Sequence, residues 1–171
     1  SGKPLRWSPL FVYHGFRYVI LHGLEQPPEP ADISAVFVHQ MVEELSSFSC
    51  SDETINRLYA CGKMATLSNL FYMPTDCPQR EKLGWTNDAQ ASAEQMLQNF
   101  AVAPLFLKWL QDILDAMTDE GALPGIVPSH GWGYENVDGP VSSGILFELP
   151  VQVYRATGDD AEIRMAYPAM Q

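Results

Sequence analysis

One apolar stripe near the middle of the chain constrains its fold more than any other feature. Between residues 102 and 117, large apolar side chains recur three and four positions apart, which places them along one face of an α-helix. Such a face has to be buried against other elements. The sequence therefore predicts a core helix here, carried by Val102, Leu105, Phe106, Trp109, Leu110, Ile113, Leu114 and Met117.

An earlier segment, residues 52–72, is also predicted to be a long helix. Ser51 precedes two acidic residues, which is typical of a helix cap followed by an acidic first turn. Asn69 lies on the apolar face of this helix, so its amide must find partners in the interior or face a site. That face is formed by Ile55, Leu58, Tyr59, Gly62, Thr66, Leu70 and Met73.

Three more helices complete the expected helical series. Residues 87–100 follow Thr86, a plausible capping residue. Residues 145–157 end at Gly158, which can adopt the left-handed conformation of a helix C-cap. Residues 159–170 begin a fifth helix that a late proline interrupts. Successive helices of this kind favour an antiparallel helical array.

The N-terminal fifth of the chain has a different character. Residues 10–21 mix aromatic and β-branched side chains close to alternation, with a slip at Gly15 that suggests a bulge. The proline-rich residues 25–32 form a loop, and residues 33–42 resume the strand pattern. Two strands are too few to close a sandwich by themselves.

We therefore expect a mainly α chain with two parts. Residues 1–48 would be the last strands of a β-sandwich domain with a linker, and residues 49–171 the first part of a helical domain. The apolar helix faces need more neighbours than this chain supplies. A piece of a longer protein is the expected explanation, and pairing with a second copy is another way to cover such faces.

The charge balance excludes some classes of partner. The chain has 10 basic and 21 acidic residues, giving a formal net charge of −11. This charge repels phosphate backbones and anionic lipid headgroups, so neither nucleic acid nor a membrane surface is an expected partner. Neutral or cationic ligands remain compatible with it, and so does a charged face that only keeps the protein soluble.

The cysteines and the hydropathy are uninformative about a site. Cys50, Cys61 and Cys77 are odd in number and contain no CxxC pair, so neither a disulfide framework nor a zinc ribbon is indicated. We expect buried or half-buried thiols. No apolar run reaches the roughly 18–20 residues of a membrane span.

The segment from Met73 to Gln90 is the strongest candidate for chemistry. It contains three carboxylates, Asp76, Glu81 and Asp88, on a proline-interrupted loop and the helix start that follows. Three uses fit this pattern. A carboxyl flanked by other carboxylates has a raised pKa and can donate a proton near neutrality; three acids can also hold calcium; or they can be solvated charges paired with nearby arginine and lysine side chains.

Aromatic residues around these acids favour a sugar site. Trp85 lies beside the carboxylates, and Trp132 and Tyr134 are candidates for the opposite side of a cleft. Flat apolar rings pack against sugar C–H groups, while Asp, Asn and Arg bond to hydroxyls. The glycine- and proline-rich residues 119–144 are read equally as a binding loop or an insert; their candidate ligand groups are His130, Trp132, Tyr134, Glu135 and Asp138.

Four motifs in order resemble one known family. They are YHGFRYV (Tyr13–Val19), FSCS (Phe48–Ser51), PTDCPQREKLGWTNDA (Pro74–Ala89) and KWLQD (Lys108–Asp112). Together they are similar to the bacterial α-L-rhamnosidases, family 78 of the glycoside hydrolases. The resemblance spans nearly the whole chain, and the third motif is the most specific part of it.

The resemblance implies a fold and a reaction. The fold is an (α/α)6-barrel catalytic domain preceded by β-sandwich domains, and the reaction is release of terminal α-L-rhamnose from glycosides with inversion and without a cofactor or metal. Glu81 matches the general acid of the family. Asp76 and Asp88 match acids that line the rhamnose pocket, Trp85 matches an aromatic that shapes it, and Trp132 is a looser match.

Two departures from the family pattern matter. Asn87 stands where the family usually has glycine, and asparagine tolerates unusual φ angles well. An inverting enzyme also needs a second carboxylate, placed about 6.5–9.5 Å from the acid. In the family this general base is a glutamate late in the barrel, so we expect it beyond Gln171 and the chain alone to be inactive; Glu135 and Glu148 are the internal alternatives.

Two other functional classes stay open at this point. One is a non-catalytic carbohydrate-binding or scaffold protein with the same fold, although pure binding does not require an intact acid motif. The other is a calcium-dependent structural module. The resemblance further implies a bacterial protein with a rhamnose-containing glycoside as its partner, and leaves the choice between cytoplasm and periplasm open.

Overall fold

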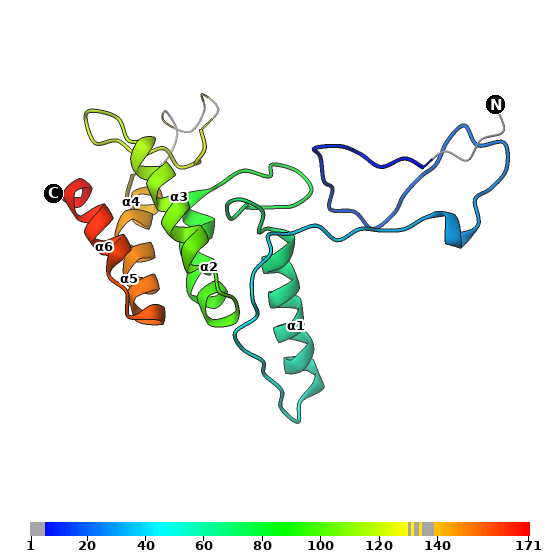
Figure 1. Cartoon of the computed structure of the whole chain (residues 1–171), viewed down its shortest axis with the longest axis horizontal. Coiled ribbons are helices and arrows are strands. Elements are labelled where there is room, and N and C mark those ends of the chain that lie inside the picture. The colour runs from blue at the N-terminus through cyan, green and yellow to red at the C-terminus, as the bar shows by residue number, and fades with distance from the viewer. Residues whose placement is uncertain (1–5, 130, 132–133, 135–138) are drawn as a thin grey trace.

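A computed structural model describes residues 6–129, 131, 134 and 139–171. It is mainly helical, as predicted. Four helices, α2, α3, α5 and α6, gather around the core, α1 stands beside α2, and the N-terminal segment extends away from the helices (Figure 1). The elements are η1 (Pro30–Asp32), α1 (Glu53–Ser68), α2 (Thr86–Asn99), α3 (Ala103–Asp115), α4 (Gly139–Ser143), α5 (Ile145–Thr157), α6 (Ala161–Ala166) and η2 (Tyr167–Met170).

Helix α3 provides the centre of the core, and this prediction is confirmed. Phe106, Trp109, Leu110 and Ile113 on its apolar stripe are completely buried. α3 packs against α5 and α6, and α5 packs along α2. The residues at the edges of the stripe, such as Leu105 and Leu114, are only partly buried but still contact the core.

Helix α1 is shorter and less buried than its sequence pattern predicts. The cap is Asp52 rather than Ser51, because the Asp52 carboxylate accepts hydrogen bonds from the backbone N–H groups of Thr54 at 2.8 Å and Ile55 at 3.4 Å. The helix ends at Ser68, four residues before the predicted end. The apolar face is buried only towards its C-terminal end, while Leu58 is exposed.

The remaining predicted helices are present with small changes. α2 begins at Thr86 itself, so Thr86 is not its cap. α5 has the predicted bounds, and Gly158 ends it with φ 76°, as expected for a left-handed C-cap. The fifth predicted helix is divided into α6 and η2, with the division just before Pro168. The short helix α4 was not predicted.

The two predicted N-terminal strands are not formed. Residues 10–21 and 33–42 are irregular, and most of their side chains are exposed. A strand requires a neighbour that satisfies its backbone donors and acceptors, and within the described residues these segments have no partner strand. The alternating pattern is therefore present in the sequence, but these two segments do not form a sheet.

Residues 43–46 attach this N-terminal part to the helices. Leu45 donates its N–H to the carbonyl of Asn99 at 2.8 Å, and Ala101 donates to Glu43 at 2.9 Å, forming an antiparallel bridge between Glu44 and Phe100.

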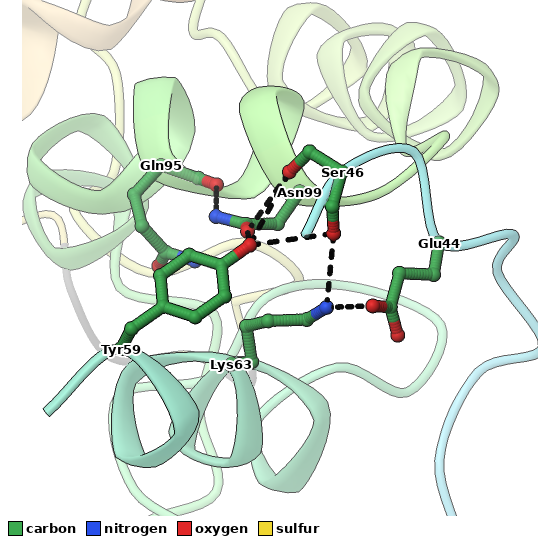
Figure 2. Close-up of polar contacts among 6 residues, drawn as sticks. All are labelled: Glu44, Ser46, Tyr59, Lys63, Gln95 and Asn99. Atoms are coloured by element: carbon green, nitrogen blue, oxygen red, sulfur yellow. Dashed lines mark hydrogen bonds and ion pairs between the residues drawn. The ribbon is translucent and has the colours of Figure 1, made fainter. Parts of the chain in front are cut away.

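Side chains reinforce this bridge (Figure 2). The Tyr59 hydroxyl on α1 lies 2.6 Å from Oδ1 of Asn99 on α2 and donates to it, and Ser46 donates to the same oxygen at 3.2 Å. Lys63 forms an ion pair with Glu44 and donates to the Ser46 carbonyl at 3.2 Å. The linker, α1 and α2 are thus joined by one polar cluster.

A second backbone pairing connects the start of α2 to the core. Val127 donates its N–H to the Gly84 carbonyl at 2.9 Å, and Thr86 donates to Gly125 at 2.9 Å, with Trp85 opposite Ile126. The buried indole N–H of Trp109 donates to the carbonyl of Val127 at 2.9 Å. Residues 84–86 are therefore held against the core helix α3.

The surface shows two further features. Cys50 and Cys61 are exposed rather than buried as predicted, and Cys77 is half-buried. Cys61 is exposed because α1 has few packing neighbours. Over the part of the chain that the structure describes, no helix combines the length and apolarity needed to cross a membrane.

Two glycines provide a matched test of this packing. A Cβ atom on Gly84 would collide with the Val127 carbonyl and lie 2.8 Å from Sδ of Met73, whereas one on Gly62 in α1 meets nothing within 4 Å. We predict that Gly84→Ala lowers the free energy of unfolding by about 1–3 kcal/mol through overpacking. Gly62→Ala should raise it by about 0.5–1 kcal/mol through helix propensity. Urea denaturation measures both changes in the free energy of unfolding. Equal effects of the two substitutions would contradict the close packing of Gly84 against Val127.

Candidate functional site

The loop that carries the predicted acids is closed by its own hydrogen bonds. Asp76 donates its N–H to the Leu83 carbonyl at 3.0 Å, and Oδ1 of Asp76 accepts the Leu83 N–H at 2.9 Å. Inside this ring, Sγ of Cys77 accepts the N–H of Glu81 at 3.1 Å. We call residues 76–83 the acid loop. One carboxylate oxygen of Asp76 is thus committed to holding the loop.

Glu81 is held by donors at both of its carboxylate oxygens. Nε1 of Trp85 donates to Oε2 at 2.7 Å, and Nη2 of Arg80 donates to Oε1 at 3.0 Å. The Glu81 side chain is 31% exposed, whereas the Arg80 side chain is 82% exposed. Trp85 is anchored by the pairing with Ile126, so its bond to Glu81 comes from a fixed position. Arg80 can move away into solvent more easily.

The structure brings the three predicted acids to one pocket. An open pocket of about 270 Å³ is lined by Asp76, Glu81, Trp85, Asn87 and Asp88. Asp76 and Glu81 come from the acid loop, and Trp85 immediately precedes α2. Asn87 and Asp88 lie in the first turn of α2. A loop and a helix start therefore converge, with acids on two sides and an indole between them.

The pKa of Asp88 is raised by its surroundings in this pocket. Partial burial raises the pKa of its carboxyl above the ordinary value, and the negative charges of Asp76 and Glu81 raise it further, against a lowering effect of the backbone hydrogen bond. Three carboxylates so close together make the pocket receptive to hydroxyl donors and to cationic groups. Within the described ranges, no group of three or more His, Cys, Asp or Glu side chains is arranged to hold a metal ion.

The basic neighbours of the acids behave differently from one another. Arg80 pairs with Glu81, as the solvated-charge interpretation predicts. Lys82 turns away from the pocket, and its Nζ donates to the backbone carbonyl of Tyr13 at 2.7 Å. Arg80 is therefore paired with an acid of the pocket, whereas Lys82 is bonded to the N-terminal segment.

Several other residues predicted for the site have structural roles or lie outside the residues that the structure describes. Asn69 is satisfied locally, since its Nδ2 donates to Ala65 at 3.1 Å and its Oδ1 accepts from Thr75 at 3.2 Å. The hydroxyl of Tyr134 donates to the carbonyl of Ala116 at 2.7 Å. Glu148 is exposed on α5. Four of the predicted ligand groups lie outside the described ranges, namely His130, Trp132, Glu135 and Asp138.

Sequence reasoning did not assign Asn87 to the pocket. Its side chain lines the pocket, and its Oδ1 is buried without a hydrogen-bond partner among the described residues. The only sequence signal was its position between Thr86 and Asp88, where the spacing alone does not show which way the amide points. Trp85 was predicted as a sugar-packing ring, and its bond to Glu81 was not foreseen.

Comparison with known sequences identifies two matching regions. The sequence model described as "bacterial alpha-L-rhamnosidase 6 hairpin glycosidase domain" matches residues 43–171. The model described as "bacterial alpha-L-rhamnosidase concanavalin-like domain" matches residues 1–39. An alpha-L-rhamnosidase of Formosa agariphila is 34% identical in an alignment 176 residues long that covers 96% of this chain and 18% of that protein.

Solved structures agree with these matches. The native alpha-L-rhamnosidase of Aspergillus terreus superposes with a TM-score of 0.84 at 31% identity, covering 95% of this chain and 19% of that one. The Streptomyces avermitilis alpha-L-rhamnosidase complexed with L-rhamnose gives a TM-score of 0.72 at 29% identity, covering 77% and 13%. The present chain thus spans less than one fifth of the length of the relatives it matches.

The crowding of carboxylates predicts a measurable coupling. Asp76→Asn removes one negative charge but keeps an oxygen that can accept the Leu83 N–H. We predict that the pKa of Asp88 falls towards its ordinary value in this variant, because the repulsion that raised it is reduced. Titration of the Asp88 side chain by NMR measures the shift. Glu120→Gln, on an exposed turn after α3, is the control and should leave the pKa of Asp88 unchanged. If Asp76→Asn also leaves the pKa of Asp88 unchanged, the coupling is disproved.

Proposed function

Because this chain belongs to the bacterial α-L-rhamnosidase family, as its match over residues 43–171 shows, we propose that it is part of a glycoside hydrolase that releases terminal α-L-rhamnose. The observation that supports this most directly is the pocket in which Glu81, Asp76 and Asp88 meet beside Trp85. A small polar pocket with acids and an indole suits a neutral sugar. The L-rhamnose complex of a relative agrees with that substrate class.

In this proposal Glu81 is the general acid. It protonates the glycosidic oxygen as the bond to the aglycone breaks, which prevents the departure of an unstable alkoxide. Trp85 fixes Oε2 from the pocket wall, whereas Oε1 is paired, among the described residues, with the exposed Arg80 alone. Oε1 is therefore the oxygen that can be freed to carry the proton. The short indole hydrogen bond keeps the carboxyl aimed while the proton is transferred.

Asp76 and Asp88 are proposed to hold the sugar. Asp76 commits Oδ1 to the acid loop, so its second oxygen remains for a sugar hydroxyl. Asp88 lies at the other side of the pocket on the first turn of α2. Trp85 shapes the wall between them, and Trp132 would add a further ring. Contacts to hydroxyls from fixed positions orient the anomeric carbon for attack.

The reaction is proposed to invert configuration at the anomeric carbon. Inversion needs a general base that activates a water on the face opposite the acid, with about 6.5–9.5 Å between the two carboxyl groups. We propose that this base comes from another part of a longer protein, after residue 171. The short share of its relatives that this chain spans supports that assignment. The 171 residues alone are then expected to be inactive.

The division of the chain is proposed to follow the two matched regions. Residues 1–48 would end a β-sandwich domain and residues 49–171 would begin the helical barrel, in line with matches to residues 1–39 and 43–171. The irregular N-terminal segment then becomes sheet only together with strands from elsewhere in the longer protein.

Replacing the proposed acid gives the first test of function. We predict that Glu81→Gln in the full-length enzyme lowers kcat for an alkyl rhamnoside about 10²- to 10⁴-fold, because no proton is supplied to a poor leaving group. The loss should be much smaller for an aryl rhamnoside with an activated leaving group. Glu94→Gln, on the exposed face of α2, is the matched control. Equal losses for both substrates would refute Glu81 as the acid.

The stereochemical outcome gives a second, independent test. We predict that the first sugar released is β-L-rhamnose, because a water directed by a separate base attacks opposite the leaving group. Proton NMR of the anomeric signal during the first minutes separates the initial product from later mutarotation. An α-L-rhamnose product would contradict inversion without contradicting the role of Glu81.

A further inference from the structure

The N-terminal segment contacts the acid loop. The ring of Tyr13 stacks on Phe71 with centroids 3.8 Å apart and planes at 20°. Most of the neighbouring N-terminal side chains are exposed, whereas Tyr13 is half-buried. This contact is therefore specific within an otherwise open segment.

Lys82 makes the second contact. Its Nζ donates to the Tyr13 carbonyl at 2.7 Å and lies 5.0 Å from the centroid of the Tyr13 ring. The Lys82 backbone has φ 59°, a left-handed conformation that is unfavourable for a lysine. Such a conformation persists when surrounding contacts determine it. Lys82, which makes this contact to Tyr13, directly follows Glu81 in the chain.

Gly15 makes the third contact. Its N–H donates to the Pro78 carbonyl at 3.1 Å. A Cβ atom on Gly15 would lie 3.1 Å from Cβ of Gln79 and 3.3 Å from Cγ of Pro78, so the two backbones approach more closely than side chains usually allow. The glycine is therefore part of the fit between the two segments.

These contacts bracket the acids of the pocket. Phe71 lies five positions before Asp76, Pro78 lies within the acid loop, and Lys82 directly follows Glu81. A shift of the N-terminal segment would therefore move both ends of the loop. The core holds the other side of the site through Trp85, so the distance between Glu81 and Trp85 depends on supports from both sides.

We propose that Tyr13, on the N-terminal segment, is a positioning residue that sets the place of Glu81 by stacking on Phe71 and anchoring Lys82. The inference rests on the proposed function for the role of Glu81. Tyr13 belongs to the region that matches the concanavalin-like domain rather than the glycosidase domain. A segment assigned to one domain thus supports the acid of the other.

Tyr13→Ala in the full-length enzyme tests the proposal. It removes the stacked ring, and loosening the acid loop should lower kcat for an alkyl rhamnoside about 10- to 100-fold with KM little changed. For an activated aryl rhamnoside, which needs less protonation, the loss should stay within about threefold. Tyr13→Phe keeps the ring and should restore most of the rate.

Tyr18→Ala is the matched control, because this tyrosine lies on the same segment and is 85% exposed. It should leave both substrates unaffected. Equal losses for the two substrates in Tyr13→Ala, or the same loss in Tyr18→Ala, would overturn the proposal. Thermal unfolding of each variant identifies a general loss of folding, and Tyr13→Phe then decides whether the ring alone supports the rate.

A measurement without substrate separates this proposal from the proposed function. In Tyr13→Ala and in Lys82→Met, hydrogen exchange of the Glu81 and Leu83 amides should become faster, while α3 amides stay unchanged. Unchanged exchange in the acid loop would overturn the positioning role even in an active enzyme. If the wild type has no rhamnosidase activity, the proposed function fails, and faster loop exchange would still support the positioning of the loop by Tyr13.

Discussion

The pairing of residues 84–86 with residues 125–127 is the constraint on which the rest of the site depends. Trp109 is completely buried in α3 and uses its only side-chain donor to hold the Val127 carbonyl. Val127 in turn holds Gly84, and the residue after Gly84 carries the indole that bonds to Glu81. A hydrogen-bonded path therefore connects the centre of the core to a carboxylate at the surface, and it passes through backbone groups that cannot rotate away.

Local patterns predicted the elements whose burial is decided within one segment. The stripe around Trp109 is dense enough to define a core helix, and Gly158 marks the end of α5 because few residues tolerate its φ of 76°. Predictions failed where a distant partner decides the outcome. Residues 10–21 have the alternation of a strand but no neighbouring strand in the described part of the chain, and Leu58 has helical spacing but remains exposed.

The same division applies to the site. Asp76, Glu81 and Asp88 could be placed together because a short loop and the next helix start leave little freedom between them. The direction of each side chain could not be predicted, because it depends on contacts far away in sequence. Lys82 turns towards Tyr13, which is 69 positions earlier, and Trp85 turns its N–H to Glu81 because Ile126 fixes its backbone. Trp132 lies outside the described residues, so its predicted role stays a prediction.

The contacts across residue 40 have a consequence for protein engineering. Sequence matches separate two regions between residues 39 and 43, which invites a chimera joined at that point. Yet Gln40 donates to the Leu70 carbonyl at 2.7 Å, and Tyr13 stacks on Phe71. Exchanging the N-terminal region between relatives would split these pairs between two parents. A functional chimera therefore has to inherit both sides of each contact from the same parent.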